Sequence, residues 1–257
     1  MSWATSSASA PKAGPDVLLD EPLPSTPAAD VQEALTALTR PASRTHVDPR
    51  EPLDLRGLHL AGARFVGADL TRVDLAGATL THADLHKAIL TRAVLSQARL
   101  TGAILIRARL SGAFLTAATL TGAQLQGATL KKANLQGATL TRADLYGATL
   151  TEGNLHGAIL AEANLQEVTL TKADLRGATL TEAELAGANF TKALLHEATL
   201  TGAELDGTIL TEANLRGASL TGAEHLDVQR VCSAVTDGTT ELPSWFYPRT
   251  DTRAAPD

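Results

Sequence analysis

Carboxylates are the most numerous side chains that could take part in chemistry in this 257-residue chain. Aspartate and glutamate number 28 against 22 lysine and arginine residues, which gives a formal net charge of -6. A carboxylate set can serve general acid and base catalysis, or it can present a negative surface to a basic partner. The seven carboxylates of most interest lie in the second half of the chain: Asp144, Glu162, Glu167, Glu182, Glu184, Glu204 and Asp206.

Motifs that support catalysis are absent from the sequence. It contains no glycine-rich phosphate-binding motif, no nucleophile elbow and no Cys/His spacing of a zinc site. The seven histidines are scattered along the sequence. In the coiled fold that the repeats described below predict, His156 and His196 share one face but lie two coils apart, about 10 Å, which is too far to share a metal ion. We therefore expect no enzymatic activity, no cofactor, no metal site and no small-molecule substrate.

A hydrophobic pattern with a period of five determines how these side chains are positioned. Leucine, or twice phenylalanine, occupies every fifth position from Leu55 to Leu220, and the residue two before it is alanine in 28 of 34 pentads. On an α-helix this spacing would distribute the leucines around every face, and on a flat strand it would alternate them between two faces. The pattern therefore predicts a chain that turns once per pentad, with all leucines in one interior.

Runs such as Ala143-Asp144-Leu145-Tyr146-Gly147 resemble the A(D/N)LxG unit of the pentapeptide-repeat family. The resemblance covers residues 53 to 222. It implies an all-β fold, a right-handed quadrilateral β-helix with four pentads per coil. A short α-helical cap is expected at each end, because an open β-helix end is a strand edge that invites aggregation.

The chain divides into four segments on this reading. A tail rich in Ala, Ser and Pro at 1-24 is expected to be disordered. Residues 25-50 hold a capping helix, with Val31, Leu35 and Leu38 on one stripe, followed by a linker. The β-helix spans 51-222, and 223-257 holds a second capping helix, with a stripe from Val228 to Val235 that ends at Asp237-Gly238, and an aromatic tail.

Composition predicts a cytoplasmic protein. The sequence shows no uninterrupted apolar run of membrane-spanning length and no basic segment followed by an apolar one at its start. Cys232 is the single cysteine, so no intrachain disulfide can form.

The distribution of charge suggests one function. Residues 53-140 carry ten Lys or Arg against four Asp, whereas residues 141-220 carry five against eleven acids, so we expect charge to divide along the rod rather than between its faces. The seven carboxylates should form an acidic stripe with only Arg142 close enough to oppose them. The family resemblance implies a DNA mimic that binds gyrase or topoisomerase and dimerises through its C-terminal end. Direct binding of nucleic acid or membrane is not expected.

Two other surfaces offer alternative functions. Five outward apolar residues within two coils predict a patch for a protein partner on a general binding scaffold, with Val94 and Phe114 on successive rungs of one face. They are Ile89, Val94, Ile104, Ile106 and Phe114. Thr-x-Thr pairs such as Thr119/Thr121 should stack into a flat ladder similar to those of ice-binding proteins, interrupted at Arg99 and Ile159.

A homodimer contact is expected near the C-terminus, where apolar and aromatic side chains gather. The residues are Val228, Val231, Val235, Trp245, Phe246 and Tyr247. The aromatic tripeptide can serve either as this anchor or as a cover for the last coil.

Overall fold

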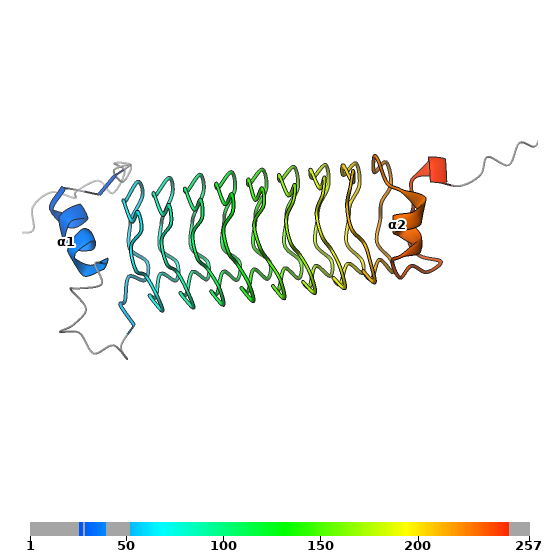
Figure 1. The fold of residues 1–257 in the computed structure, drawn as a ribbon. Coiled ribbons are helices and arrows are strands. Elements are labelled where there is room, and N and C mark those ends of the chain that lie inside the picture. Colours follow the sequence, from blue (N-terminus) through cyan, green and yellow to red (C-terminus); the bar gives the residue numbers. More distant parts are fainter. Residues whose placement is uncertain (1–25, 28, 40–51, 247–257) are drawn as a thin grey trace, which may run out of the picture.

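A rod-shaped solenoid makes up most of the molecule, with a helix at each end (Figure 1). The computed structural model describes residues 26-27, 29-39 and 52-246. The element order is α1 (Ala29–Thr39), the solenoid, α2 (Val228–Cys232) and the 3-10 helix η2 (Ser244–Phe246). The tail 1-24, most of the linker and Tyr247 lie outside the described residues. No helix in the described part of the chain is long and apolar enough to cross a membrane.

Each coil of the solenoid consists of four pentads and makes four turns. Its strands are single-residue parallel bridges, and from Asp54 to Glu224 every bridge joins positions that differ by 20 in the numbering. The bridges form four columns, one on each side of the rod, and we name each side after its first bridge residue: the Asp54, His59, Arg64 and Asp69 sides. Since these residues follow one another at intervals of five, the Arg64 side is opposite the Asp54 side and adjacent to the Asp69 side.

Backbone hydrogen bonds fix this register on every rung. A bridge residue donates its N–H to the preceding coil and accepts at its carbonyl from that same coil, as Thr119 does with Ala98 at 2.9 Å and with Leu100 at 2.7 Å. Successive coils are therefore hydrogen-bonded to each other on every side of the rod. No loop is inserted into the coils between residues 54 and 224.

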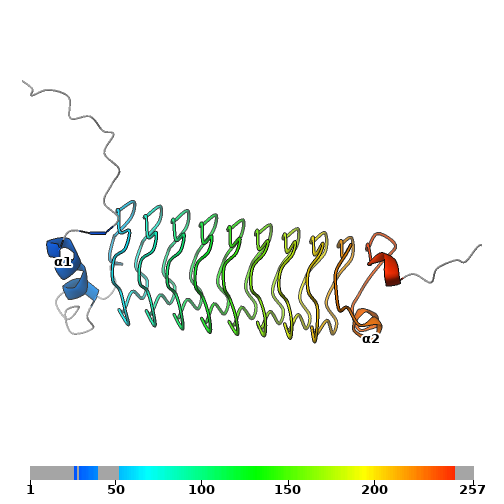
Figure 2. The same ribbon diagram turned by 90° about the horizontal axis from the view of Figure 1, so that it is seen from above.

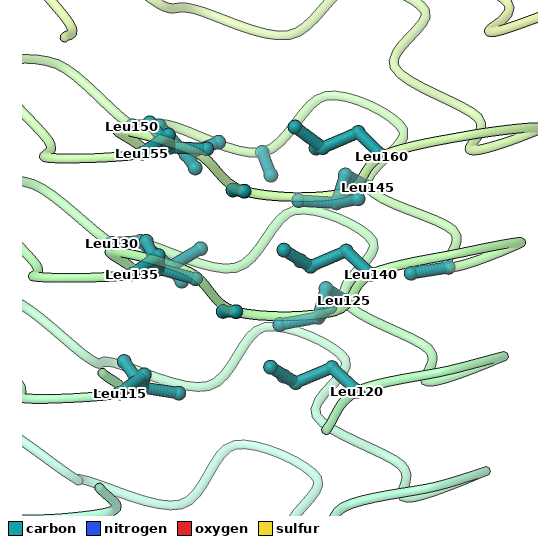
Figure 3. Packing of buried hydrophobic residues seen from close by; sticks show 14 of the residues in the cluster. Leu115, Leu120, Leu125, Leu130, Leu135, Leu140, Leu145, Leu150, Leu155 and Leu160 are labelled. Carbon is teal, nitrogen blue, oxygen red and sulfur yellow. The ribbon is translucent and has the colours of Figure 1, made fainter. Parts of the chain in front are cut away.

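Leucine side chains fill the interior in stacked columns. Figure 3 shows Leu115, Leu135 and Leu155 above one another, with Leu120, Leu140 and Leu160 stacked beside them. From Leu70 to Leu205 every fifth residue has an exposed fraction of 0%, and the alanines two residues earlier are buried as well. This column accounts for the apolar period seen in the sequence, because burial of each leucine contributes about 1.5-3 kcal/mol.

The corners explain why glycine is frequent two residues after each leucine. From position 57 to 222 every fifth residue has a φ between 54° and 69°, which is the left-handed region. The following alanine donates to the leucine carbonyl, as Ala118 does to Leu115 at 3.0 Å, so each corner is a type II turn. Glycine adopts this conformation without strain, yet half of these positions hold other residues, including Ala117.

At the N-terminal end, α1 lies across the first coil (Figures 1 and 2). Leu35 is buried against the core, whereas Val31 is exposed. The side chain of Gln32 accepts from Arg64 N at 2.8 Å through Oε1 and donates to Arg64 O at 2.9 Å through Nε2. Gln32 thus makes the two hydrogen bonds that a preceding coil would make with a bridge residue.

At the C-terminal end, α2 is shorter than the sequence predicts. It ends at Cys232, whereas the apolar stripe extends the expected helix to Asp237. Val235 instead forms a bridge with Asn214, accepting from Leu215 N and donating to Ala213 O, both at 2.8 Å. Val235 pairs with the last coil as a bridge residue, and a residue in a bridge cannot also belong to a helix, so α2 ends before it. Arg230 Nη1 donates to Thr208 O at 2.6 Å on another side.

Replacement of Ala117 by glycine should stabilise the fold. Ala117 has a φ of 54°, and relief of left-handed strain is expected to raise the free energy of unfolding by about 1 kcal/mol. Denaturant unfolding measures this change. Ala118→Gly is the matched control because Ala118 is buried at the next position, and it should lower stability. A loss of stability in both variants would contradict the assignment.

Replacement of Gln32 by alanine should loosen the first coil at Arg64. The Arg64 amide loses the acceptor 2.8 Å away, so a loss of about 1 kcal/mol should raise its hydrogen-exchange rate by a factor of about five. Native-state exchange resolved at single amides tests this. The exposed neighbour Glu33 supplies the control Glu33→Ala. Equal acceleration of exchange in both variants would show that the hydrogen bond from Gln32 does not protect the Arg64 amide.

Candidate acidic binding surface

The structure gathers the predicted carboxylates on the Arg64 side. Its bridge column runs through Asp144, Asn164, Glu184, Glu204 and Glu224 on five successive rungs. Glu184, Glu204 and Glu224 are exposed, while Asp144 is partly buried. Three glutamates are therefore stacked at one-rung intervals, which is about 4.8 Å.

Corner residues extend this column on both edges. Glu162 and Glu182 lie at the corner shared with the His59 side, and Glu167 and Asp206 lie at or beside the corner shared with the Asp69 side. A methyl group added at Gly202 would lie 3.4 Å from the Cγ atom of Glu182 on the preceding rung. That separation is at the limit of an ordinary van der Waals contact, and Glu162 and Glu182 occupy the equivalent corners of the two preceding rungs. We call the eight carboxylates the acidic surface: Asp144, Glu162, Glu167, Glu182, Glu184, Glu204, Asp206 and Glu224.

One cation opposes this surface, as the sequence indicates. Arg142 Nε lies 2.8 Å from Glu162 Oε2. No other carboxylate of the acidic surface has a cation within ion-pair distance among the described residues. Neutral amides contact two of them: Gln126 donates to Asp144 at 2.5 Å and Gln166 donates to Glu184 at 2.7 Å.

Asp144 differs from the glutamates in its local role. Its Oδ1 accepts from the backbone N–H of Tyr146 at 3.0 Å, and Asn164 accepts in the same way from Gln166. These turns explain why Asp and Asn precede leucine so often. No such bond holds Glu204 or Glu224 within the described chain. Their carboxylates are therefore available to a partner.

The acidic surface perturbs a neighbouring phenol. A hydrogen bond to Glu167, and then its negative charge, raise the pKa of Tyr146 above the usual tyrosine value. Tyr146 is exposed, so this edge presents a phenol and a carboxylate together.

Charge in the second half of the molecule is divided between sides as well as along the rod, contrary to the expectation from sequence. The Asp54 side, opposite the acidic surface, carries four acids and four bases there, and several are paired. Arg176 Nη2 lies 2.6 Å from Asp174 Oδ2 and lowers the pKa of that carboxyl group. Lys192 and Glu212 approach to 3.5 Å. The unbalanced negative charge therefore lies on the Arg64 side.

Glu224 is a member of the acidic surface that the leucine pattern does not predict. The pattern fails at His225, so the sequence places the end of the solenoid at residue 222. The bridge from Glu204 to Glu224 shows that the ladder continues through the residue before the missing leucine. The sequence does carry one indication of this role, because Glu224 follows Glu204 by 20 residues, which is one full coil of four pentads.

The predicted apolar patch is not contiguous. Val94 and Phe114 form a bridge on the Asp54 side, as expected, and Phe114 is 48% exposed. Ile104 lies in the column of the opposite Arg64 side, with Ile106 at its edge, and Ile89 lies on the Asp69 side. Positions half a coil apart fall on opposite sides of the rod, so the five residues cannot form one surface.

The threonine ladder has the register that the sequence predicts. The His59 column contains Thr119 and Thr139 on successive rungs, and Arg99 and Ile159 interrupt it at their expected places.

The residues predicted for dimerisation have unequal exposure. Val228 and Trp245 are 52% and 53% exposed, and Val235 is also exposed. Val231 is buried, and Phe246 packs against the core, so neither offers a free surface. Tyr247 lies outside the described residues.

No group of three or more His, Cys, Asp or Glu side chains is placed to hold a metal ion within the described ranges. The acidic surface is an extended array of separate carboxylates. Its chemistry is long-range attraction of positive charge and acceptance of hydrogen bonds.

Comparison with known families agrees with this geometry. The family profile described as pentapeptide repeats matches in eight copies, over residues 54–86, 80–116, 118–157, 158–196 and 188–224. The chain belongs to the pentapeptide-repeat family. No curated protein matches the sequence.

Several solved structures of pentapeptide-repeat proteins are similar to the chain. HetL, involved in regulation of heterocyst differentiation in the cyanobacterium Nostoc sp. PCC 7120, is 30% identical over 75% of this chain and 89% of its own, with a TM-score of 0.36. QnrB1, a plasmid-mediated fluoroquinolone resistance protein, is 22% identical over 73% and 91%, with a TM-score of 0.35. A protein of the Arabidopsis thaliana thylakoid lumen is 27% identical over 47% and 81%, with a TM-score of 0.30.

Removal of the negative charge at Glu167 should lower the pKa of Tyr146. The carboxylate of Glu167 favours the neutral phenol, so Glu167→Gln should shift the titration of Tyr146 down toward the usual tyrosine value. Ultraviolet absorbance of tyrosinate measures this in a Tyr247→Phe background, where Tyr146 is the single tyrosine. Glu184→Gln makes the same charge change farther from the phenol and should shift it less. Equal shifts would contradict the contact.

Proposed function

We propose that this protein is a non-enzymatic binding protein whose acidic surface docks on a positively charged, nucleic-acid-binding surface of a protein partner. The observation that supports the proposal is the set of eight carboxylates on one side, opposed by Arg142 alone. An array of like charges on a regular scaffold attracts a basic partner and speeds its association.

The charge density of the acidic surface suits imitation of DNA over a short length. Four rung intervals span about 19 Å. B-DNA carries a charge every ~1.7 Å of axis, so a duplex of that length has about 11 charges, of which about half lie on one face. Eight carboxylates meet that density. The half of the rod before residue 141 lacks such a set, so mimicry is confined to the second half.

Gyrase or another topoisomerase is the partner we propose to test, acting in the cytoplasm as the composition predicts. This choice rests on the resemblance to DNA-mimicking members of the family and on the acidic surface. A homodimer through the exposed Val228, Val235 and Trp245 would place two acidic halves next to each other. This homodimer is a prediction. If the contact is C-terminal, truncation after residue 223 should reduce the mass in solution to that of the monomer.

We also propose that α1 and the segment after residue 225 are end caps. Gln32 and Arg230 donate side-chain hydrogen bonds to backbone carbonyls at the two ends. Such bonds occupy edges that would otherwise pair with other chains.

Reversal of two charges in the glutamate column should weaken partner binding. Glu184→Lys with Glu204→Lys places two cations in the column, and we expect affinity for purified gyrase to fall by roughly tenfold or more. Surface-immobilised binding and a supercoiling assay measure the effect.

The matched control reverses two glutamates away from the acidic surface. Glu197→Lys with Glu212→Lys makes the same net charge change at corners of the Asp54 side, and binding should be retained. If wild-type protein at micromolar concentration neither binds gyrase nor alters supercoiling, the choice of partner is wrong. If both double variants bind equally, the acidic surface is not the docking site.

A further inference from the structure

A second charged array, of opposite sign, lies on the Asp69 side of the first half of the rod. It contains seven cations and one acid, Asp69. Lys132 has an acidic partner, Glu152, at 3.3 Å. The other six cations have no acid within ion-pair distance in the part of the chain that the structure describes. We call this array the basic surface: Arg72, Lys87, Arg92, Arg107, Arg109, Lys131 and Lys132.

The basic surface has the same regular spacing as the acidic surface. Arg72 and Arg92 occupy equivalent corner positions one rung apart, and Lys132 follows two rungs later. Arg109 stands in the bridge column between Ile89 and Thr129. Both surfaces lie on sides without inserted loops between residues 54 and 224. Cations and carboxylates therefore recur at one common axial spacing, about 4.8 Å.

The two surfaces cannot neutralise each other within one molecule. The basic surface lies on the Asp69 side before residue 133, and the acidic surface lies on the adjacent Arg64 side after residue 141. The basic surface spans three rung intervals and the acidic surface four, with opposite charge and the same period, but the two are displaced along the rod and around it. A second copy of the chain supplies the complement that one copy lacks.

We propose that the basic surface of one copy binds the acidic surface of another copy. The contact is heterologous, because it joins different surfaces on the two molecules. A contact that joins one basic surface to one acidic surface leaves one of each free in every pair. Association therefore continues with concentration instead of stopping at two copies, and it covers the acidic surface that a protein partner would use.

A second copy fits the basic surface better than a nucleic-acid duplex does. A straight duplex that continues along the Asp69 side would meet Glu167 and Asp206 at its edge. The acidic surface of a second copy avoids this conflict.

Sedimentation equilibrium over a range of concentrations tests the proposal. At about 10 mM salt the weight-average mass should rise above two copies of the 26.7 kDa chain, and at about 1 M salt, where the Debye length is ~3 Å, this concentration dependence should disappear. Association that stops at two copies in both salts would overturn the proposal and favour the C-terminal dimer.

Two complementary variants make the test specific. Arg92→Glu with Arg109→Glu reverses two charges of the basic surface, and Glu184→Lys with Glu204→Lys reverses two charges of the acidic surface. Glutamate already occupies equivalent corner and bridge positions, at Glu152 and Glu184, so the fold should be retained. Each variant alone should lose the association that low salt promotes, whereas an equimolar mixture of the two should recover it. Association of either variant alone, to the wild-type extent, would overturn the proposal.

A matched control and a competitor complete the design. Arg99→Glu with Arg216→Glu makes the same charge change away from both surfaces and should associate like the wild type; a loss equal to that of Arg92→Glu with Arg109→Glu would show a net-charge effect and overturn the proposal. A short DNA duplex, as long as the rod, is the competitor. If it binds through Arg92 and Arg109 and dissolves the association, the basic surface is a nucleic-acid site and the proposal is wrong. Because Arg92 and Arg109 lie outside the acidic surface, gyrase binding by that variant remains a separate measurement.

Discussion

The hydrogen bonds between rungs are the constraint on which the rest of the structure depends. Each bridge residue is bonded to the coil before it, and the next leucine N–H reaches the coil after it, as in the bonds from Thr119 N to Ala98 O and from Leu120 N to Thr139 O. Because the repeat never changes length between residues 54 and 224, equivalent positions of successive coils share a column. The leucine core and the left-handed corners both follow from this register.

The same register converts scattered sequence positions into linear arrays of charge. Corner columns place long side chains one rung apart, so opposite signs form ion pairs there. Lys132 with Glu152, Arg142 with Glu162 and Lys192 with Glu212 are all pairs between equivalent corners of successive coils. Where like signs are stacked, as in Glu184, Glu204 and Glu224, pairing is impossible within the column. The pattern of signs along a column thus decides whether a side is neutral or strongly charged.

The sequence predicted the interior and the columns because both depend only on the period. It could not predict how the period ends. The chain inserts an extra residue between Asn214 and its bridge partner Val235, which breaks the regular spacing, so the apolar stripe was interpreted as helix. Gln32 was not singled out, because its role depends on contact with Arg64, which is distant in the sequence. The apolar patch failed for a different reason: proximity in sequence within two coils does not mean that residues share a side.

Stacking of like charges has an energetic consequence that helps to separate structural charges from functional ones. Like charges directly opposite on neighbouring strands are destabilising, whereas opposite charges contribute roughly 0.2-1 kcal/mol per pair. A chain selected for stability alone would mix the signs in each column, as a corner column of the Asp54 side does in the second half of the rod with Lys192 and Glu212. The glutamate column and the first half of that corner column, with Arg72 and Arg92, instead stack charges of one sign. These two arrays lie on adjacent sides, in different halves of the rod. Salt ions screen the repulsion within each array, and an oppositely charged surface of another molecule relieves it further, which is why we propose these two arrays as binding surfaces.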